Sequence, residues 1–131
     1  MKKEVMIIQG ISKPNLPFNH VVKAGGFLFL TSQLSVNLKT GDIKNGTIVE
    51  QTQQSLENVK FLLSHCGATM DDIVKVVIYM RNLKDFDKIN QVYCKYFTQG
   101  NEPARVAVQA ISPIDGVDIE IEVVAFNCKE N

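Results

Sequence analysis

Two alternating segments near the C-terminal end of the chain carry the residues best suited to chemistry. In the segment Ala104 to Ile111, apolar residues alternate on one side, and Arg105 lies on the other side. In the segment Val117 to Phe126, Glu120 likewise lies opposite the apolar residues. An arginine fork can hold a carboxylate through two charge-assisted hydrogen bonds. A nearby carboxylate can orient and partly deprotonate a water molecule. Together these residue types indicate attack of water on an electrophilic carbon of an anionic molecule.

The two segments are joined by Ser112-Pro113-Ile114-Asp115-Gly116, a turn-like stretch that predicts a final β-hairpin. If both apolar rows face the core, Arg105 and Glu120 lie on the same side of adjacent strands. The pattern leaves the register open, so the two residues are either direct partners or diagonal neighbours. The alternative interpretation is a cross-strand ion pair on a solvated face, worth about 0–1 kcal/mol.

Helical and strand-like segments upstream would position this pair. Thr47 to Cys66 predicts a helix, because Thr47 and Glu50 have capping-box spacing and the apolar residues follow helical spacing. Asp85 to Thr98 predicts a second helix with one apolar face. The remaining predictions are strands over Ile73 to Arg81 and Phe27 to Leu30, a short apolar run from Glu4 to Gln9, and a hairpin turn at Lys39-Thr40-Gly41-Asp42.

This order of elements predicts an α+β fold in which two helices cover one face of a sheet. Apolar residues also fall on the uncovered face, since Phe27 to Leu30 is apolar on both sides and Val77, Val124 and Phe126 alternate away from the core. An exposed apolar surface of that kind favours self-association. The alternative is a monomer with a mildly apolar surface.

Composition narrows the class of protein. The 131 residues fit one domain, 1–131, and Lys plus Arg (14) equals Asp plus Glu (14). Zero net charge without a basic cluster argues against nucleic-acid binding, which depends on phosphate neutralisation. Three dispersed cysteines predict neither a disulfide framework nor a zinc site. No apolar run has the length of a signal peptide or membrane span, so we expect a soluble protein in a reducing, cytoplasmic compartment.

A longer stretch around Arg105 carries a family resemblance. Glu102-Pro103-Ala104-Arg105-Val106-Ala107-Val108, then Pro113 and Val117-Asp118-Ile119-Glu120-Ile121-Glu122-Val123-Val124-Ala125, closely resembles the signature of the Rid (YjgF-like) family. The resemblance extends through nearly the whole chain. It includes Val36-Asn37 with Lys39-Thr40-Gly41, Gln54-Ser55-Leu56-Glu57-Asn58-Val59-Lys60, Asp72-Ile73-Val74-Lys75, Asp85-Phe86 and Asn90.

The resemblance implies a chorismate-mutase-like fold, with two helices on a mixed, mostly antiparallel sheet, assembled as a homotrimer with clefts between subunits. It implies hydrolysis of 2-imino acids, such as 2-iminobutanoate and 2-iminopropanoate, to keto acids and ammonia without cofactor or metal. Arg105 matches the arginine that binds the substrate carboxylate, and Glu120 the glutamate that handles the water. Asn90 matches a helix residue that supports the site.

Three positions depart from the family pattern. Phe18 stands where active members commonly have tyrosine, and Ala107 replaces a frequent cysteine. Thr31 aligns with a serine, although a one-residue gap would substitute Ser32. We expect Phe18, Thr31, Ala107 and Asn90 to contact the substrate. The alternatives are a non-enzymatic module binding a small carboxylate or a partner, a hydrolase acting on another carboxylated substrate, and the ribonuclease or translation-inhibitor role suggested for some relatives.

Overall fold

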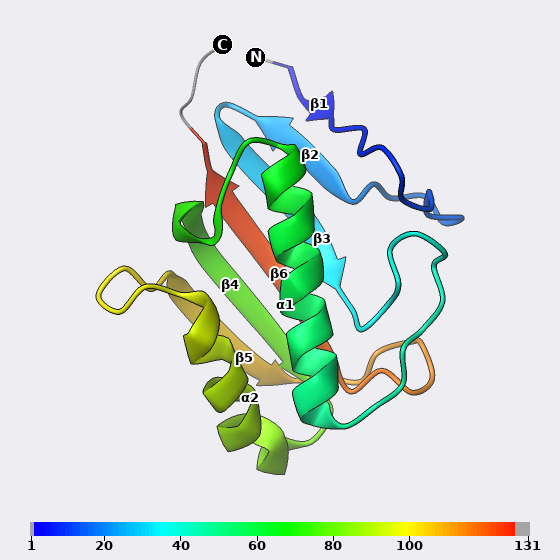
Figure 1. Ribbon diagram of the computed structural model, residues 1–131, viewed down its shortest axis with the longest axis vertical. Helices are drawn as coiled ribbons and strands as arrows, with labels where there is room; N and C mark the ends of the chain where they lie inside the picture. Colours follow the sequence, from blue (N-terminus) through cyan, green and yellow to red (C-terminus); the bar gives the residue numbers. More distant parts are fainter. Residues whose placement is uncertain (1, 128–131) are drawn as a thin grey trace.

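The computed structural model describes residues 2–127, which form one six-stranded sheet with two α-helices on one of its faces (Figure 1). The strand order is β1-β2-β3-β6-β4-β5, and every neighbouring pair is antiparallel except β4 and β5. The predicted α+β class and the single helical layer on a mixed sheet are confirmed. The elements are β1 (Glu4–Val5), β2 (Val21–Ala24), β3 (Phe27–Gln33), α1 (Ile48–His65), β4 (Ile73–Met80), α2 (Phe86–Tyr93), β5 (Ala104–Gln109) and β6 (Ile119–Phe126).

Helix α1 begins where its capping residues predict. The Thr47 side chain accepts a hydrogen bond from the Glu50 N–H, and the Glu50 carboxylate accepts one from the Thr47 N–H. Each bond satisfies a backbone donor that the first helical turn leaves without a partner. The helix ends at His65, and Gly67 follows with a φ of 77°, a left-handed conformation that favours glycine.

Helix α2 is shorter than the sequence predicts. It covers Phe86–Tyr93 and continues as a 3-10 turn over Cys94–Tyr96, where the prediction extends to Thr98. Of the apolar run from Glu4 to Gln9, only the two residues Glu4–Val5 form a strand, β1. The predicted turn at residues 39–42 is present, with Gly41 N–H donating to the Asn37 carbonyl.

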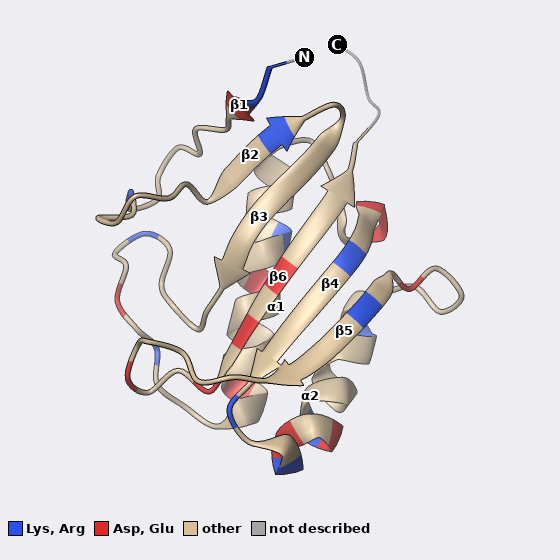
Figure 2. Ribbon diagram, turned by 180° about the vertical axis from the view of Figure 1, so that it is seen from behind, with Lys and Arg blue, Asp and Glu red and all other residues tan. Residues whose placement is uncertain are grey.

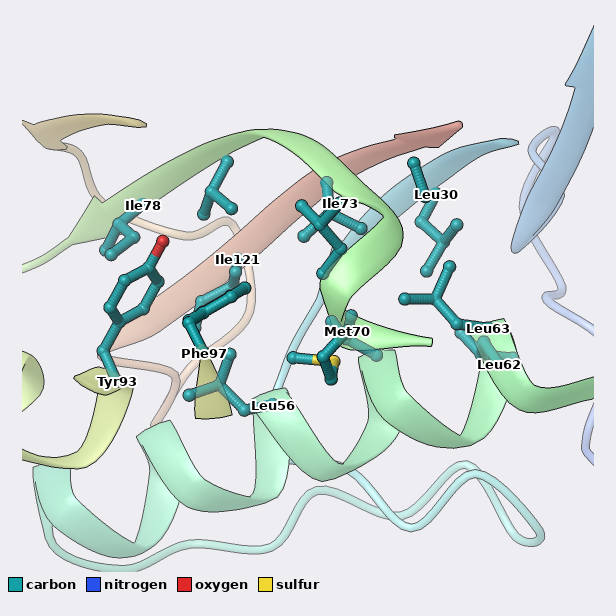
Figure 3. Packing of buried hydrophobic residues seen from close by; sticks show 14 of the residues in the cluster. Leu30, Leu56, Leu62, Leu63, Met70, Ile73, Ile78, Tyr93, Phe97 and Ile121 are labelled. Atoms are coloured by element: carbon teal, nitrogen blue, oxygen red, sulfur yellow. The ribbon is translucent and has the colours of Figure 1, made fainter. Parts of the chain in front are cut away.

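The core lies between the sheet and the two helices. Leu56, Leu62 and Leu63 of α1, Ile78 of β4 and Ile121 of β6 are all fully buried, and the close view shows them between the helices and the sheet (Figure 3). Burying a leucine or isoleucine side chain contributes about 1.5–3 kcal/mol. The helix-covered face of the sheet therefore includes the buried residues of β4 and β6, two adjacent inner strands.

The predicted final hairpin is wrong. Strands β5 and β6 do not pair with each other, because β4 lies between them: Arg105 is in register with Val76, and Glu120 with Tyr79. A strand, a helix and a second strand form a unit in which the two strands run parallel, and β4, α2 and β5 adopt this arrangement. The segment after β5 then passes to the far side of β4 before β6 begins (Figure 1).

The face of the sheet without helices is called the open face below. Phe27, Phe29 and Phe126 lie on it and are 39%, 46% and 39% exposed. Their rings contact one another, with centroids 4.9 Å apart for Phe27 and Phe126. Val106 and Val108 of β5 lie on the same face, two strands away from β6, and are 43% and 40% exposed. The apolar row of β5 therefore faces outward, not into the core as the sequence predicts.

The cysteines are not paired among the described residues. Cys66 and Cys94 are free thiols, and Cys128 lies outside the described part of the chain. Between residues 2 and 127, no helix combines the length and hydrophobicity that crossing a bilayer requires.

Candidate functional site

Arg105 lies beneath helix α2, on the helix-covered face of edge strand β5. Its register partner Val76 is fully buried in the core, and residues in register share a face of the sheet. The guanidinium carbon lies 5.6 Å from the ring centroid of Phe86 and 4.9 Å from that of Tyr93. Two aromatic rings of α2 thus hold the cation in place, each through an interaction of about 0.5–1 kcal/mol at a partly exposed site.

The Arg105 guanidinium carries an uncompensated charge. Its Nη1 donates a 2.7 Å hydrogen bond to Oδ1 of Asn90, a neutral amide. Among residues 2–127, no carboxylate forms an ion pair with it. A half-buried cation held only by neutral groups has lost part of its hydration and gained no counterion. Such a group attracts an anion, and the planar fork fits a carboxylate.

Glu120 has a defined orientation on the open face of β6. Its Oε1 accepts a 2.6 Å hydrogen bond from the hydroxyl of Ser32, at the irregular end of β3. The carboxylate is partly buried, and no basic side chain of the described residues pairs with it. Ser32 thus holds one carboxylate oxygen, which leaves the other available to a water molecule.

A pocket of about 260 Å³ opens beside Glu120. Glu122 also lines it, and Oε1 of Glu122 accepts a 2.8 Å hydrogen bond from the hydroxyl of Tyr79. That hydrogen bond, together with burial and the neighbouring carboxylates, raises the pKa of Tyr79. The other lining residues are Ser32, Asp118, Ile119, Val117 and the loop from Ala110 to Pro113.

Buried Gln51 attaches one wall of this pocket to helix α1. Its Nε2 donates to the carbonyls of Gly46 and Gly116 and to the Asp118 carboxylate, while its Oε1 accepts from the Asp118 N–H. The loop before β6 is thereby tied to the beginning of α1. The sequence analysis missed Gln51, since a lone glutamine within a helix gives no signal for such a contact.

The hydroxyl beside Glu120 belongs to Ser32, not to Thr31. A bulge between Leu30 and Gln33 adds one residue to β3, and Ser32 lies within it. Thr31 donates its backbone N–H to the carbonyl of His20. The hydroxyl beside Glu120 is thus that of Ser32, the alternative that the sequence left open, and contact of Thr31 with the substrate stays a prediction.

The other expected site residues fall into two separate places. Ala107 is in register with Ile78 and lies on the same side of β5 as Arg105, so Asn90, Arg105 and Ala107 form one group. Phe18 precedes β2 near the other edge of the sheet, where its ring meets His20 edge-on, and it is 44% exposed. Phe18 therefore does not meet Arg105 within one chain.

Arg105 and Glu120 are also separated within the chain, contrary to the sequence prediction. They lie on opposite faces of the sheet. Strand β4 lies between β5 and β6, as Figure 2 shows. Two strand spacings of about 4.8 Å and three residues of about 3.3 Å place their Cα atoms roughly 14 Å apart. Within one chain, the guanidinium of Arg105 and the carboxylate of Glu120 therefore cannot contact the same small molecule.

Metal ligation finds no support in the same region. Across residues 2–127, no group of three or more His, Cys, Asp or Glu side chains is arranged to hold a metal ion. The acidic residues around the pocket are instead bonded to hydroxyl and amide donors.

Comparison with known proteins identifies the family. Residues 10–127 match the family model described as Endoribonuclease L-PSP. A RutC family protein of Pyrococcus horikoshii is 42% identical over 95% of this chain and 98% of its own length. A protein of Dermatophagoides farinae named 2-iminobutanoate/2-iminopropanoate deaminase is 34% identical over 84% of this chain and 85% of its own.

Solved structures give the same result. A Rid family protein of Yersinia pestis, YyfA, superimposes with a TM-score of 0.88 at 31% identity, covering 95% of this chain and 99% of that one. TdcF of E. coli, solved with bound serine, gives a TM-score of 0.84 at 31% identity, covering 95% and 98%. The chain belongs to the family of Endoribonuclease L-PSP proteins, which includes the RutC and Rid proteins, and the predicted Rid resemblance is confirmed.

Proposed function

We propose that this protein hydrolyses 2-imino acids to 2-keto acids and ammonia at sites formed between copies of the chain. The observation that carries the proposal is the Arg105 guanidinium, which neutral groups hold and no carboxylate of the described residues neutralises. A relative at 34% identity is named a deaminase of this type, and TdcF was solved with serine, a small molecule with a carboxylate.

The open face suggests how the two halves of the site meet. Phe27, Phe29 and Phe126 expose more apolar surface than single scattered residues need. Association of copies through this face would cover it and place β5 of one copy near β6 of the next. We propose a homotrimer, in which Arg105 of one subunit and Glu120 of its neighbour share a cleft, with the aromatic ring of Phe18 as part of the wall.

The proposed chemistry needs only positioning and proton transfer. Arg105 binds the substrate carboxylate, and Glu120 takes a proton from a water molecule as that water attacks the C=N carbon. Glu120 then gives that proton to the imine nitrogen, which completes the carbinolamine. A second proton passes from the carbinolamine hydroxyl, by way of Glu120, to the amine nitrogen, and ammonia leaves as the C–N bond breaks and the carbonyl forms. Holding substrate and water together removes an entropic barrier of up to about 7–11 kcal/mol in the ideal limit. No cofactor or metal takes part, and the expected location is the cytoplasm.

A coupled assay tests the proposal. An amino-acid oxidase or a pyridoxal-phosphate dehydratase generates 2-iminobutanoate, and the rate of 2-oxobutanoate release is followed with and without this protein. We expect a saturable acceleration that Arg105→Gln abolishes. No acceleration above the uncatalysed rate, at any protein concentration, would exclude this function.

The second candidate is a non-enzymatic module that binds a small carboxylate, because Arg105 alone suffices for binding. Glu120→Gln distinguishes the two: a deaminase loses hydrolysis and keeps ligand binding, whereas a binding module shows no hydrolysis in either form. The family description names an endoribonuclease activity. Zero net charge favours imine hydrolysis over that activity, because RNA binding depends on basic residues that neutralise phosphates.

A further inference from the structure

Three residues of helix α2 contact the same guanidinium. Phe86, Asn90 and Tyr93 are separated by four and three residues, the spacing that aligns side chains on one face of a helix. All three touch Arg105: the two rings by their faces and the amide by a hydrogen bond. The contact face of α2 at this point is therefore devoted to one side chain of strand β5.

The type of contact matters for an anion-binding group. A glutamate or aspartate on α2 would also fix the guanidinium, but it would neutralise the charge and occupy the fork. Aromatic faces hold a cation by their quadrupole and leave its hydrogen-bond donors free. Asn90 takes Nη1 alone. Among residues 2–127, the adjacent Nε and Nη2 donors have no hydrogen-bond partner, and together they make one edge of the fork.

Tyr93 is the more informative of the two rings. It is 7% exposed, and its ring packs against Phe97 with centroids 4.5 Å apart. Figure 3 shows its hydroxyl pointing toward the sheet near Ile78. That hydroxyl is buried without a hydrogen-bond partner among the described residues. An unsatisfied buried hydroxyl destabilises a fold, so the ring, and not the hydroxyl, accounts for a function of this residue.

We propose that Phe86 and Tyr93 are positioning residues, which hold the plane of the Arg105 guanidinium so that its Nε–Nη2 edge grips the ligand carboxylate side-on. This inference rests on the proposed carboxylate-binding role of Arg105. It adds Phe86 and Tyr93, whose rings contact the guanidinium. Replacing either ring disturbs the orientation of the fork and leaves the positive charge of Arg105 in place.

Matched variants separate the ring from the hydroxyl. Tyr93→Phe keeps the ring, and Tyr93→Leu removes it; Phe86→Leu removes the other ring at a position that is 37% exposed and tolerant of change. We expect Phe86→Leu and Tyr93→Leu each to raise the Kd for 2-oxobutanoate about two- to fivefold, the effect of losing one cation–π contact. In these two variants KM should rise in parallel with Kd, while kcat stays within about twofold. Tyr93→Phe should have the Kd, KM and kcat of the parent protein, and its melting temperature should be the same or higher.

Side-chain NMR makes the test independent of the ligand. The Arg105 Nε–H signal is assigned by its disappearance in Arg105→Gln. In the parent protein and in Tyr93→Phe, this signal should show slow hydrogen exchange with water and a ring-current shift. Both features should diminish in Phe86→Leu and Tyr93→Leu. An unchanged signal and unchanged Kd in the two leucine variants would overturn the proposal, as would a Tyr93→Phe variant as impaired as Tyr93→Leu. If the parent protein binds no 2-oxo acid while the NMR changes occur, the carboxylate-binding role fails and the positioning contact stands.

Discussion

Arg105 and Glu120 lie on opposite faces of one sheet, with strand β4 between their strands. Each is held by neutral partners, Asn90 for the cation and Ser32 for the carboxylate, and neither has an opposite charge within the described residues. The proposed function therefore requires a second copy of the chain to bring these two groups to one substrate.

The guanidinium fork, and not the positive charge alone, should be required for binding. Arg105→Lys keeps a cation but loses the planar pair of donors, so we expect at least a tenfold weaker binding of 2-oxobutanoate, or about 1.4 kcal/mol. Isothermal titration calorimetry measures the effect. Arg105→Gln serves as the control for fold, since loss of two partly exposed cation–π contacts should lower the free energy of unfolding by no more than about 2 kcal/mol. Binding by Arg105→Lys equal to that of the parent would contradict this assignment.

Ser32 should act through Glu120. Ser32→Ala removes the 2.6 Å hydrogen bond to Oε1 and frees the carboxylate to rotate, so kcat should fall about three- to tenfold while KM changes little. Thr31→Val, one residue away, is the matched control and should leave kcat within about twofold. A larger loss in Thr31→Val than in Ser32→Ala would show that the hydroxyls are assigned in the wrong order.

The three tyrosines should ionise late as the pH rises. Burial is the main cause that raises the pKa of Tyr93 to about 12, and Tyr79 and Tyr96 also have raised pKa values, with hydrogen bonds to Glu122 and Glu57 among the causes. The folded state thus favours the neutral phenols. Their contribution to stability is complete below pH 10 and is lost as the pH rises toward the folded pKa values. Phenolate absorbance should appear at higher pH in the native protein than in urea; coincident titrations would contradict these contacts.

His20 should make the fold sensitive to acid. Its Nδ1 is buried without a partner among residues 2–127, and burial lowers the pKa of His20 below 6.5 although a hydrogen bond with Ser12 partly opposes this shift. The unfolded chain therefore binds a proton at a higher pH than the folded one, and the free energy of unfolding falls as the pH drops below about 6.5. Urea unfolding of His20→Asn over this pH range should show a weaker dependence; an identical dependence would assign the effect to other groups.

Local sequence signals predict local structure well here. The capping pair Thr47 and Glu50 locates the start of α1, and alternation locates β4 and β6. The hairpin prediction failed because two physical rules competed at residues 110–118. A short polar connection favours a hairpin, whereas a helix between two strands favours a parallel neighbour, and the second rule fixes β5 beside β4.

That error explains why the site was only partly predictable. The prediction placed Val106 and Val108 in the core and therefore put Arg105 on the wrong face of the sheet. The alternation of β5 is compatible with either orientation of the strand, so the pattern alone does not decide which row faces the core. In the fold, these valines line the open face, and Arg105 faces α2. The motif identified Arg105 and Asn90, which do contact each other. Ser32 was an alternative to Thr31, and the bulge brings it to Glu120. The contacts of Phe86 and Tyr93 with Arg105 became visible only with the helix face in place.

Subunit complementation tests most directly whether Arg105 and Glu120 act together across a boundary between copies. Equal amounts of Arg105→Gln and Glu120→Gln, each inactive alone, are unfolded together and refolded, and native mass spectrometry verifies mixed oligomers. Random assembly in a closed ring should restore about one quarter of parent activity per total protein, because one site in four receives both intact residues. Parent protein mixed equally with the double variant should also give about one quarter. No restored activity in the first mixture and one half in the second would place both residues in one chain's site and contradict the proposal.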